Sequence, residues 1–167
     1  MSVPPPTAAD GPTVHPAVAA LGFLLGTWAG RGTGGYATIA PFAYEEEVRV
    51  SHVGRPYLSY AQRTWHPDDG RAMHAETGYL RLGEGGHVEM VIAHPTGVVE
   101  VEEGTLSGRT LELRSRVVAS TSTAKEVTAL TRRISVEGDV LDYVVGMGAV
   151  GQELQEHLTG TLRRVAP

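Results

Sequence analysis

The chain has 167 residues, of which 41% are hydrophobic and 20% are charged, and its formal net charge is -5 at pH 7. This composition is typical of a soluble globular protein with one domain, and the negative charge offers no basic surface for nucleic acid or an anionic membrane. The absence of cysteine excludes disulfides, iron–sulfur clusters and cysteine nucleophiles. Any metal must therefore be held by histidine or carboxylate side chains.

Residues 1–13 are predicted to form a flexible N-terminal arm, and residues 14–167 to form a single domain. The arm is rich in proline and has no lysine or arginine, so it lacks the charged start of a secretory signal. No apolar run reaches the roughly 20 residues of a membrane span. We therefore expect a cytoplasmic protein that does not contact a membrane. The alanine- and leucine-rich residues 16–25 predict a short helical turn at the start of the domain.

Three glycines surround a tryptophan in Gly26-Thr27-Trp28-Ala29-Gly30-Arg31-Gly32. In a strand, glycines at this spacing indicate a close approach of backbones or a sharp bend, with Trp28 filling the space behind them. A phosphate-binding loop is a poor alternative, because the spacing fits neither the Walker nor the dinucleotide pattern and no helix follows.

From Phe42 onward, apolar and polar residues alternate with a period of two, which is typical of half-buried strands. Turns rich in glycine, proline and aspartate separate the strands, as in Pro67-Asp68-Asp69-Gly70. The expected strands cover residues 42–54, 57–66, 73–82, 87–94, 98–106, 110–119, 125–136, 140–147 and 151–164. With the glycine–tryptophan strand, they make a set of about ten.

Short connections without crossovers predict an antiparallel up-and-down sheet. Closure of this sheet removes both of its edges, so the predicted fold is an all-β, up-and-down β-barrel. Barrels of eight or more strands have a ligand-sized interior, and we therefore expect a small molecule inside. A two-sheet sandwich, which would leave no pocket, is the alternative.

The last predicted strand contains His157. Alternation places His157 and Thr159 on one face of this strand, and Leu158 and Gly160 on the other. A neutral imidazole is a common ligand of iron or zinc, and small neighbours would leave room for a large group beside it. The alternative is an ordinary strand histidine whose ring nitrogens are both hydrogen-bonded.

The other six histidines show no spacing typical of a zinc site, so a bare catalytic metal is not expected. Three of them are expected in solvent: His15, His66 and His87. Three others lie within or at the ends of strands, where a barrel can turn them inward: His52, His74 and His94. A porphyrin would need only one axial histidine.

Nucleophilic catalysis is not indicated, since there is no Gly-x-Ser-x-Gly elbow. The run Glu45-Glu46-Glu47 is interpreted as a solvated strand face rather than an acid–base pair.

The motif from Gly26 to Gly32 matches the Gly-x-Trp-x-Gly-x-Gly motif of the nitrobindins. The chain resembles this family, and most closely its mycobacterial and other actinobacterial members. The resemblance runs from about residue 21 to residue 164 and is carried by three further segments: Thr38 to Glu46, Met73 to Tyr79 and Met147 to Leu158.

The resemblance implies that residues 14–167 form a ten-stranded barrel, similar to fatty-acid-binding proteins, with one haem b per subunit and His157 as the axial iron ligand and catalytic residue. It implies further haem contacts by Thr38 and by Lys125, whose ammonium would pair with a propionate. Pocket-lining positions follow for four more residues: Met73, His74, His94 and Met147.

The implied activity is the isomerisation of peroxynitrite to nitrate at a ferric haem with an open distal side, together with nitric oxide binding. The family also suggests a homodimer. Because no arginine or strong acid is recognisable beside the iron, peroxidase chemistry is not expected.

Two alternatives stay open, namely a barrel that binds haem or nitric oxide without catalysis, and a carrier of an apolar ligand without iron. Turnover beyond one equivalent per haem, and Soret absorbance after addition of hemin, would distinguish them.

Overall fold

The computed structural model describes residues 12–165, so almost all of the predicted arm lies outside the described residues. A 3-10 helix, η1 (Pro16–Leu24), precedes ten strands, and a second short 3-10 helix, η2 (Glu84–Gly86), separates the fourth and fifth strands. The strands are β1 (Gly26–Tyr36), β2 (Ile39–Ser51), β3 (Leu58–Trp65), β4 (Ala72–Leu82), β5 (His87–Ala93), β6 (Val98–Ser107), β7 (Thr110–Ser120), β8 (Val127–Glu137), β9 (Val140–Ala149) and β10 (Gln155–Arg164). Among the described residues, no helix is long and apolar enough to cross a membrane.

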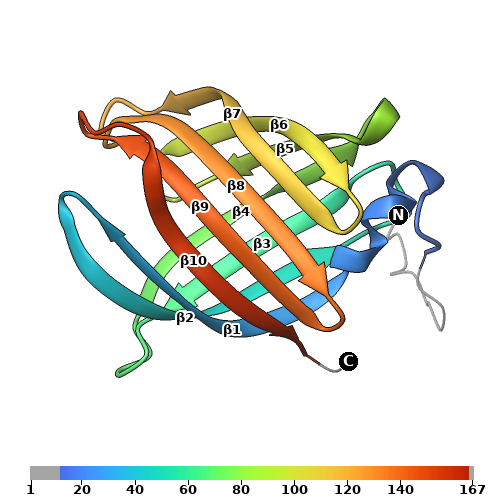
Figure 1. Ribbon diagram of the computed structural model, residues 1–167, viewed down its shortest axis with the longest axis horizontal. Helices are drawn as coiled ribbons and strands as arrows, with labels where there is room; N and C mark the ends of the chain where they lie inside the picture. Colours follow the sequence, from blue (N-terminus) through green and yellow to red (C-terminus); the bar gives the residue numbers. More distant parts are fainter. Residues whose placement is uncertain (1–11, 166–167) are drawn as a thin grey trace, which may run out of the picture.

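The sheet is a closed barrel. Each strand pairs antiparallel with the next strand of the chain, and β1 pairs with β10, which removes both sheet edges (Figure 1). The predicted up-and-down barrel is therefore confirmed, and the alternative of a two-sheet sandwich is wrong. The predicted strands are present, but their first and last residues differ slightly from the prediction. Alternation shows that a strand exists but does not define its terminal residues.

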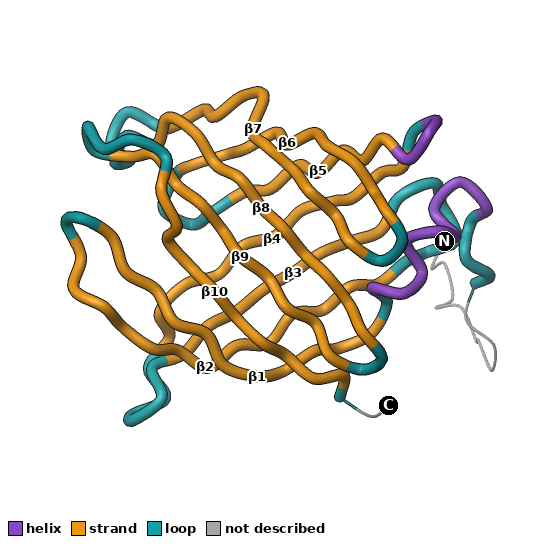
Figure 2. Tube along the Cα trace, in the orientation of Figure 1, coloured by secondary structure: helices purple, strands orange, loops and turns teal. Residues whose placement is uncertain are grey.

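The two ends of the barrel differ. Helix η1 covers one end, the closed end, where Val18, Leu21 and Leu24 are buried. The loops that join β1 to β2, β3 to β4, β5 to β6, β7 to β8 and β9 to β10 lie at the opposite end, the open end (Figure 2). Ile39 and Met73 belong to its rim, since they are 45% and 38% exposed and also line the interior. Access to the interior is therefore through the open end.

The glycines of β1 are required by close packing. A Cβ atom on Gly32 would overlap the ring of Tyr44, and one on Gly30 would overlap the backbone carbonyl of Thr161 in β10. The predicted close approach at the glycine–tryptophan motif is thus confirmed. Trp28 is fully buried and donates its indole N–H to a carbonyl at the end of η1, at 2.8 Å. The motif therefore joins the barrel wall to the closed end.

Candidate functional site

The barrel contains a cavity of about 330 Å³, which lies within the size range of small-molecule sites. Most of its lining side chains are aliphatic or aromatic. The polar lining residues are Glu46, Gln62, Thr64, His74, Glu76, His94, Thr96, Arg132 and His157. The ligand-sized interior expected from the number of strands is therefore present.

His157 lies at a β-bulge near the open end. Glu156 pairs with Gly146 of β9 and Leu158 pairs with Val145, so His157 is the extra residue without a partner in β9. An extra residue interrupts the alternation of side chains along a strand. His157 and Leu158 both line the cavity as a result. The predicted alternation, which placed them on opposite faces, is wrong here because it assumed a regular strand.

A hydrogen bond orients the imidazole of His157. Its Nδ1 lies 2.9 Å from the carbonyl oxygen of Gly35, which can only accept, so Nδ1 carries the proton and Nε2 keeps its lone pair. The rings of Tyr36 and Phe42 pack edge-on against the imidazole, with centroids 5.5 and 6.5 Å away. Within residues 12–165, Nε2 has no hydrogen-bond partner. The side chain is thus held in the tautomer that can ligate a metal through Nε2.

The other predicted site residues fall into two groups. Four of them line the cavity: Met73, His74, His94 and Met147. Thr38 and Lys125 do not line it but are exposed in the β1–β2 and β7–β8 loops of the open end. The structure thus brings five of the seven predicted residues, His157 included, into one cavity, with the other two at its entrance end. Contacts of Thr38 and Lys125 with a cofactor stay predictions.

An arginine surrounded by carboxylates lies inside the barrel. Arg132 is 6% exposed, and its Nη1, Nη2 and Nε atoms lie 3.1, 3.3 and 3.3 Å from Glu76, Glu100 and Glu102. Burial lowers the pKa of Arg132, but the carboxylates raise it well above its usual value. Burial raises the pKa of Glu76, but Arg132 and His94 bring it below the usual value. Burial raises the pKa of Glu102. The sequence pattern did not reveal this arginine inside the barrel, where all three of its guanidinium nitrogens contact carboxylates.

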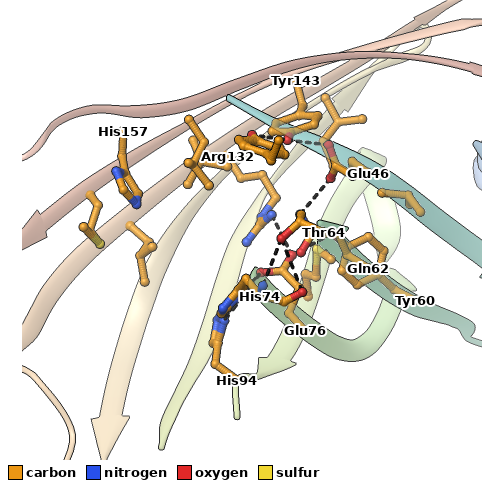
Figure 3. Close-up of a pocket in the computed structure, with 18 of the residues that line it drawn as sticks. Glu46, Tyr60, Gln62, Thr64, His74, Glu76, His94, Arg132, Tyr143 and His157 are labelled. Carbon is orange, nitrogen blue, oxygen red and sulfur yellow. Dashed lines mark hydrogen bonds and ion pairs between the residues drawn. The ribbon is translucent and has the colours of Figure 1, made fainter. Parts of the chain in front are cut away.

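A second buried network surrounds Glu46. Its Oε1 accepts a hydrogen bond from Gln62 Nε2 at 2.7 Å, and its Oε2 accepts one from the Tyr143 hydroxyl at 2.6 Å (Figure 3). The Tyr143 and Tyr44 hydroxyls lie 2.5 Å apart. Burial raises the pKa of Glu46 to about 7. The interpretation of the glutamate run as a solvated face is wrong for its middle member, because strand alternation turns Glu46 inward and leaves both neighbours outside.

Two histidines meet at the wall formed by β4 and the end of β5. His74 Nε2 lies 3.1 Å from His94 Nδ1, and His94 Nε2 lies 2.7 Å from Glu100 Oε1. Burial lowers the pKa of His74. Burial also lowers the pKa of His94, but the hydrogen bond to Glu100 and the negative charges of Glu76 and Glu100 together outweigh this effect and raise the pKa above its usual value. In Figure 3 this pair and Glu76 lie apart from His157.

The ligand atoms of His74, Glu76 and His94 lie within 4.8 Å of one another. These three residues are therefore a candidate metal-ligand set, although their spacing along the chain is not typical of a zinc site. Spacing along the chain does not show this set, because His74 and Glu76 lie in β4 whereas His94 lies just beyond β5.

The sequence does contain a signal of the buried arginine, since Arg132 interrupts the apolar inward face of β8 between Leu130 and Ile134.

The residues present fit the haem that the resemblance implies. The mainly apolar lining suits a porphyrin, and the open end leaves its propionates a way to solvent. His157 offers one imidazole, and its Nδ1–H donates to a backbone carbonyl, which is how proteins orient imidazole ligands.

Comparison with known proteins gives the same assignment. The profile of the "THAP4-like, heme-binding beta-barrel domain" family matches residues 17–164. "Peroxynitrite isomerase 2" of Mycobacterium avium (strain 104) is 54% identical over 155 residues, which are 90% of this chain and 96% of that protein. "Peroxynitrite isomerase" of Nocardia farcinica (strain IFM 10152) is 52% identical over 155 residues, 90% of this chain and 92% of that protein.

A solved structure agrees with both sequence matches. The crystal structure of Rv2717c from M. tuberculosis superimposes with a TM-score of 0.87 at 49% identity, covering 92% of this chain and 100% of that chain. The predicted resemblance to mycobacterial and other actinobacterial proteins is confirmed by these matches. The chain therefore belongs to the family of THAP4-like, heme-binding β-barrel domains, and haem is its cofactor.

Proposed function

We propose that this chain is a haem-dependent peroxynitrite isomerase, which converts peroxynitrite to nitrate. The names of its relatives and its membership of a haem-binding family support this activity. The observation that carries the proposal is the hydrogen bond from His157 Nδ1 to the Gly35 carbonyl, at 2.9 Å. It leaves Nε2 free to be the single protein ligand of the iron, in a cavity of suitable size.

The other predicted contacts have separate roles in this proposal. Met73 and Met147 supply apolar walls around the cofactor. Thr38 and Lys125 are exposed at the open end, where the polar edge of a haem would lie, and the Lys125 ammonium would pair with a propionate there. His74 and His94 line the cavity away from His157.

A ferric haem held by His157 would supply a Lewis acid for the anionic substrate. The apolar wall excludes water and confines the reacting fragments, which favours recombination to nitrate over the escape of radicals. Each guanidinium nitrogen of Arg132 already contacts a carboxylate, so this side chain does not polarise a peroxide as in a peroxidase. The same haem would also bind nitric oxide. The cytoplasmic location and the homodimer stay predictions.

The test is to mix ferric, haem-loaded protein with peroxynitrite and to follow the decay of substrate and the yield of nitrate. We expect accelerated decay, more than one turnover per haem and nitrate as the main product. A His157→Ala variant should lose this acceleration, and a His87→Ala variant, changed on the exposed surface, should keep it. Decay that is not accelerated, or that stops after one equivalent, would exclude the isomerase and leave a binding protein.

A further inference from the structure

We propose that His74, Glu76 and His94 form a second metal site, for a divalent transition-metal ion of the zinc or ferrous iron class. The three residues line the same cavity as His157 but do not include it. The proposal goes beyond the isomerase activity and does not depend on it.

The three candidate ligand atoms have a suitable separation. His74 Nε2 lies 3.1 Å from His94 Nδ1, Glu76 Oε2 lies 3.5 Å from His94 Nδ1, and Glu76 Oε2 lies 4.0 Å from His74 Nε2. In a tetrahedral site with bonds of about 2.0–2.1 Å, the ligand atoms are roughly 3.3 Å apart. The observed distances lie on both sides of this value. A metal ion can therefore be held after small rotations of the side chains.

His94 is prepared to act as a ligand. Its Nε2 lies 2.7 Å from Glu100 Oε1, and a carboxylate accepts a hydrogen bond, so the proton is on Nε2. In the neutral imidazole Nδ1 then keeps its lone pair, accepts a hydrogen bond from His74 Nε2 at 3.1 Å and faces Glu76. A metal ion would displace the proton between the two imidazoles. A carboxylate that holds the second nitrogen of a histidine is a regular feature of metal sites.

The carboxylate of Glu76 is oriented in a similar way. Its Oε1 accepts hydrogen bonds from the Tyr60 hydroxyl at 2.7 Å and from Arg132 Nη1 at 3.1 Å. Its Oε2 faces His74 and His94 instead. One oxygen is thus fixed by two donors, and the other is available to a metal ion, as in sites whose carboxylate ligands are themselves hydrogen-bonded.

The charges around the site also favour a cation. Three buried carboxylates, on Glu76, Glu100 and Glu102, share the single guanidinium of Arg132. Within the described part of the chain, Glu100 Oε2 and Glu102 Oε1 have no hydrogen-bond partner. Three carboxylates beside one guanidinium are an excess of buried negative charge, which is costly, and a divalent ion would offset it.

The donor set indicates the class of metal. Two imidazole nitrogens and one carboxylate oxygen suit zinc, ferrous iron and related ions, whereas calcium and magnesium prefer more oxygen ligands. Three protein ligands leave at least one position for water or a small anion, which is the arrangement of reactive rather than structural zinc sites. Because all three ligands line the cavity, that position would be open to it.

The test is a calorimetric titration of the full-length chain, loaded with hemin, with zinc chloride as the probe. We expect one Zn²⁺ per chain. His74→Ala and His94→Ala should each weaken binding by at least about 100-fold, more than the loss of an outer hydrogen-bond partner usually costs. His87→Ala is the control, because this histidine is also beside a carboxylate, 3.8 Å from Glu103, but is exposed on the surface.

X-ray absorption at the zinc edge should detect two imidazole ligands in the parent protein. Circular dichroism establishes whether each variant is folded. If an alanine variant is unfolded, His74→Gln or His94→Gln is used in its place. The titration is repeated on haem-free His157→Ala, so the site is tested even if the proposed haem enzyme is wrong. No zinc uptake, uptake unchanged in both the His74 and His94 variants, or uptake lost only with His157 would each overturn the proposal.

Discussion

The imidazole of His157 and the backbone of Gly35 are joined by a hydrogen bond of 2.9 Å between Nδ1 and the carbonyl oxygen. This bond connects the bulge of β10 to the end of β1, and β1 and β10 are the two strands whose pairing closes the barrel. Barrel closure thus orients the proposed iron ligand.

His157→Gly should lose the five-coordinate ferric haem spectrum, because it removes the only imidazole that we assign to the iron. Added imidazole should enter the vacated space and restore that spectrum, since the rest of the cavity wall is unchanged. Absorption spectra of the hemin-loaded variant, with and without imidazole, measure both effects. A spectrum like that of the parent protein before imidazole is added would show that another residue binds the iron.

Gly32→Ala should destabilise the barrel by about 1–3 kcal/mol, the usual cost of overpacking. The new methyl group would overlap the ring of Tyr44, which packs against β1. Gly22→Ala is the matched control, because a Cβ atom there meets nothing within 4 Å, and its effect should stay within about 0.5 kcal/mol. Urea unfolding of the haem-free proteins compares them, and equal midpoints would contradict the packing argument.

Glu46 should make the protein less stable as the pH rises from about 4.5 to about 7. The pKa of this carboxyl is raised from 4.5 to about 7 in the folded state. Below this window both states are protonated. Within it the unfolded state releases its proton first, so the free energy of unfolding falls by up to about 3 kcal/mol and then stays level.

Glu46→Gln should remove this part of the pH dependence, because an amide does not ionise. Glu45→Gln serves as the control, since its side chain is 47% exposed and lies on the outer face of the same strand. Urea unfolding at pH 5 and at pH 7.5 measures the difference for each protein. The assignment would fail if Glu46→Gln and the parent lost the same stability between the two pH values.

Arg132→Met should cost about 3–5 kcal/mol, because it leaves buried carboxylates without their cation. Arg133→Met, on the opposite face of β8, should cost at most about 1 kcal/mol, as expected for a surface ion pair. The Arg133 side chain is 56% exposed and lies 3.5 Å from Glu112. Chemical denaturation measures both values. A small effect of Arg132→Met would indicate that the three carboxylates are protonated in the folded protein.

The sequence by itself determined the barrel. Period-two alternation from Phe42 onward and turns such as residues 67–70 are properties of neighbouring residues, and they were sufficient to predict ten antiparallel strands. The glycine–tryptophan motif predicted the close approach of β1 to its neighbours. The resemblance carried by this motif and by the segment around His157 indicated the family and its haem.

Only the tertiary structure decided which side chains face the cavity together. A bulge defined by the pairing of β10 with β9 turns both His157 and Leu158 toward the cavity, whereas simple alternation predicted opposite faces for them. His74, Glu76 and His94 form a set because β4 and β5 are neighbours, and Arg132 reaches Glu76 from β8 across the interior. Strand register and contacts across a cavity join residues far apart in the chain, so no local pattern contains them.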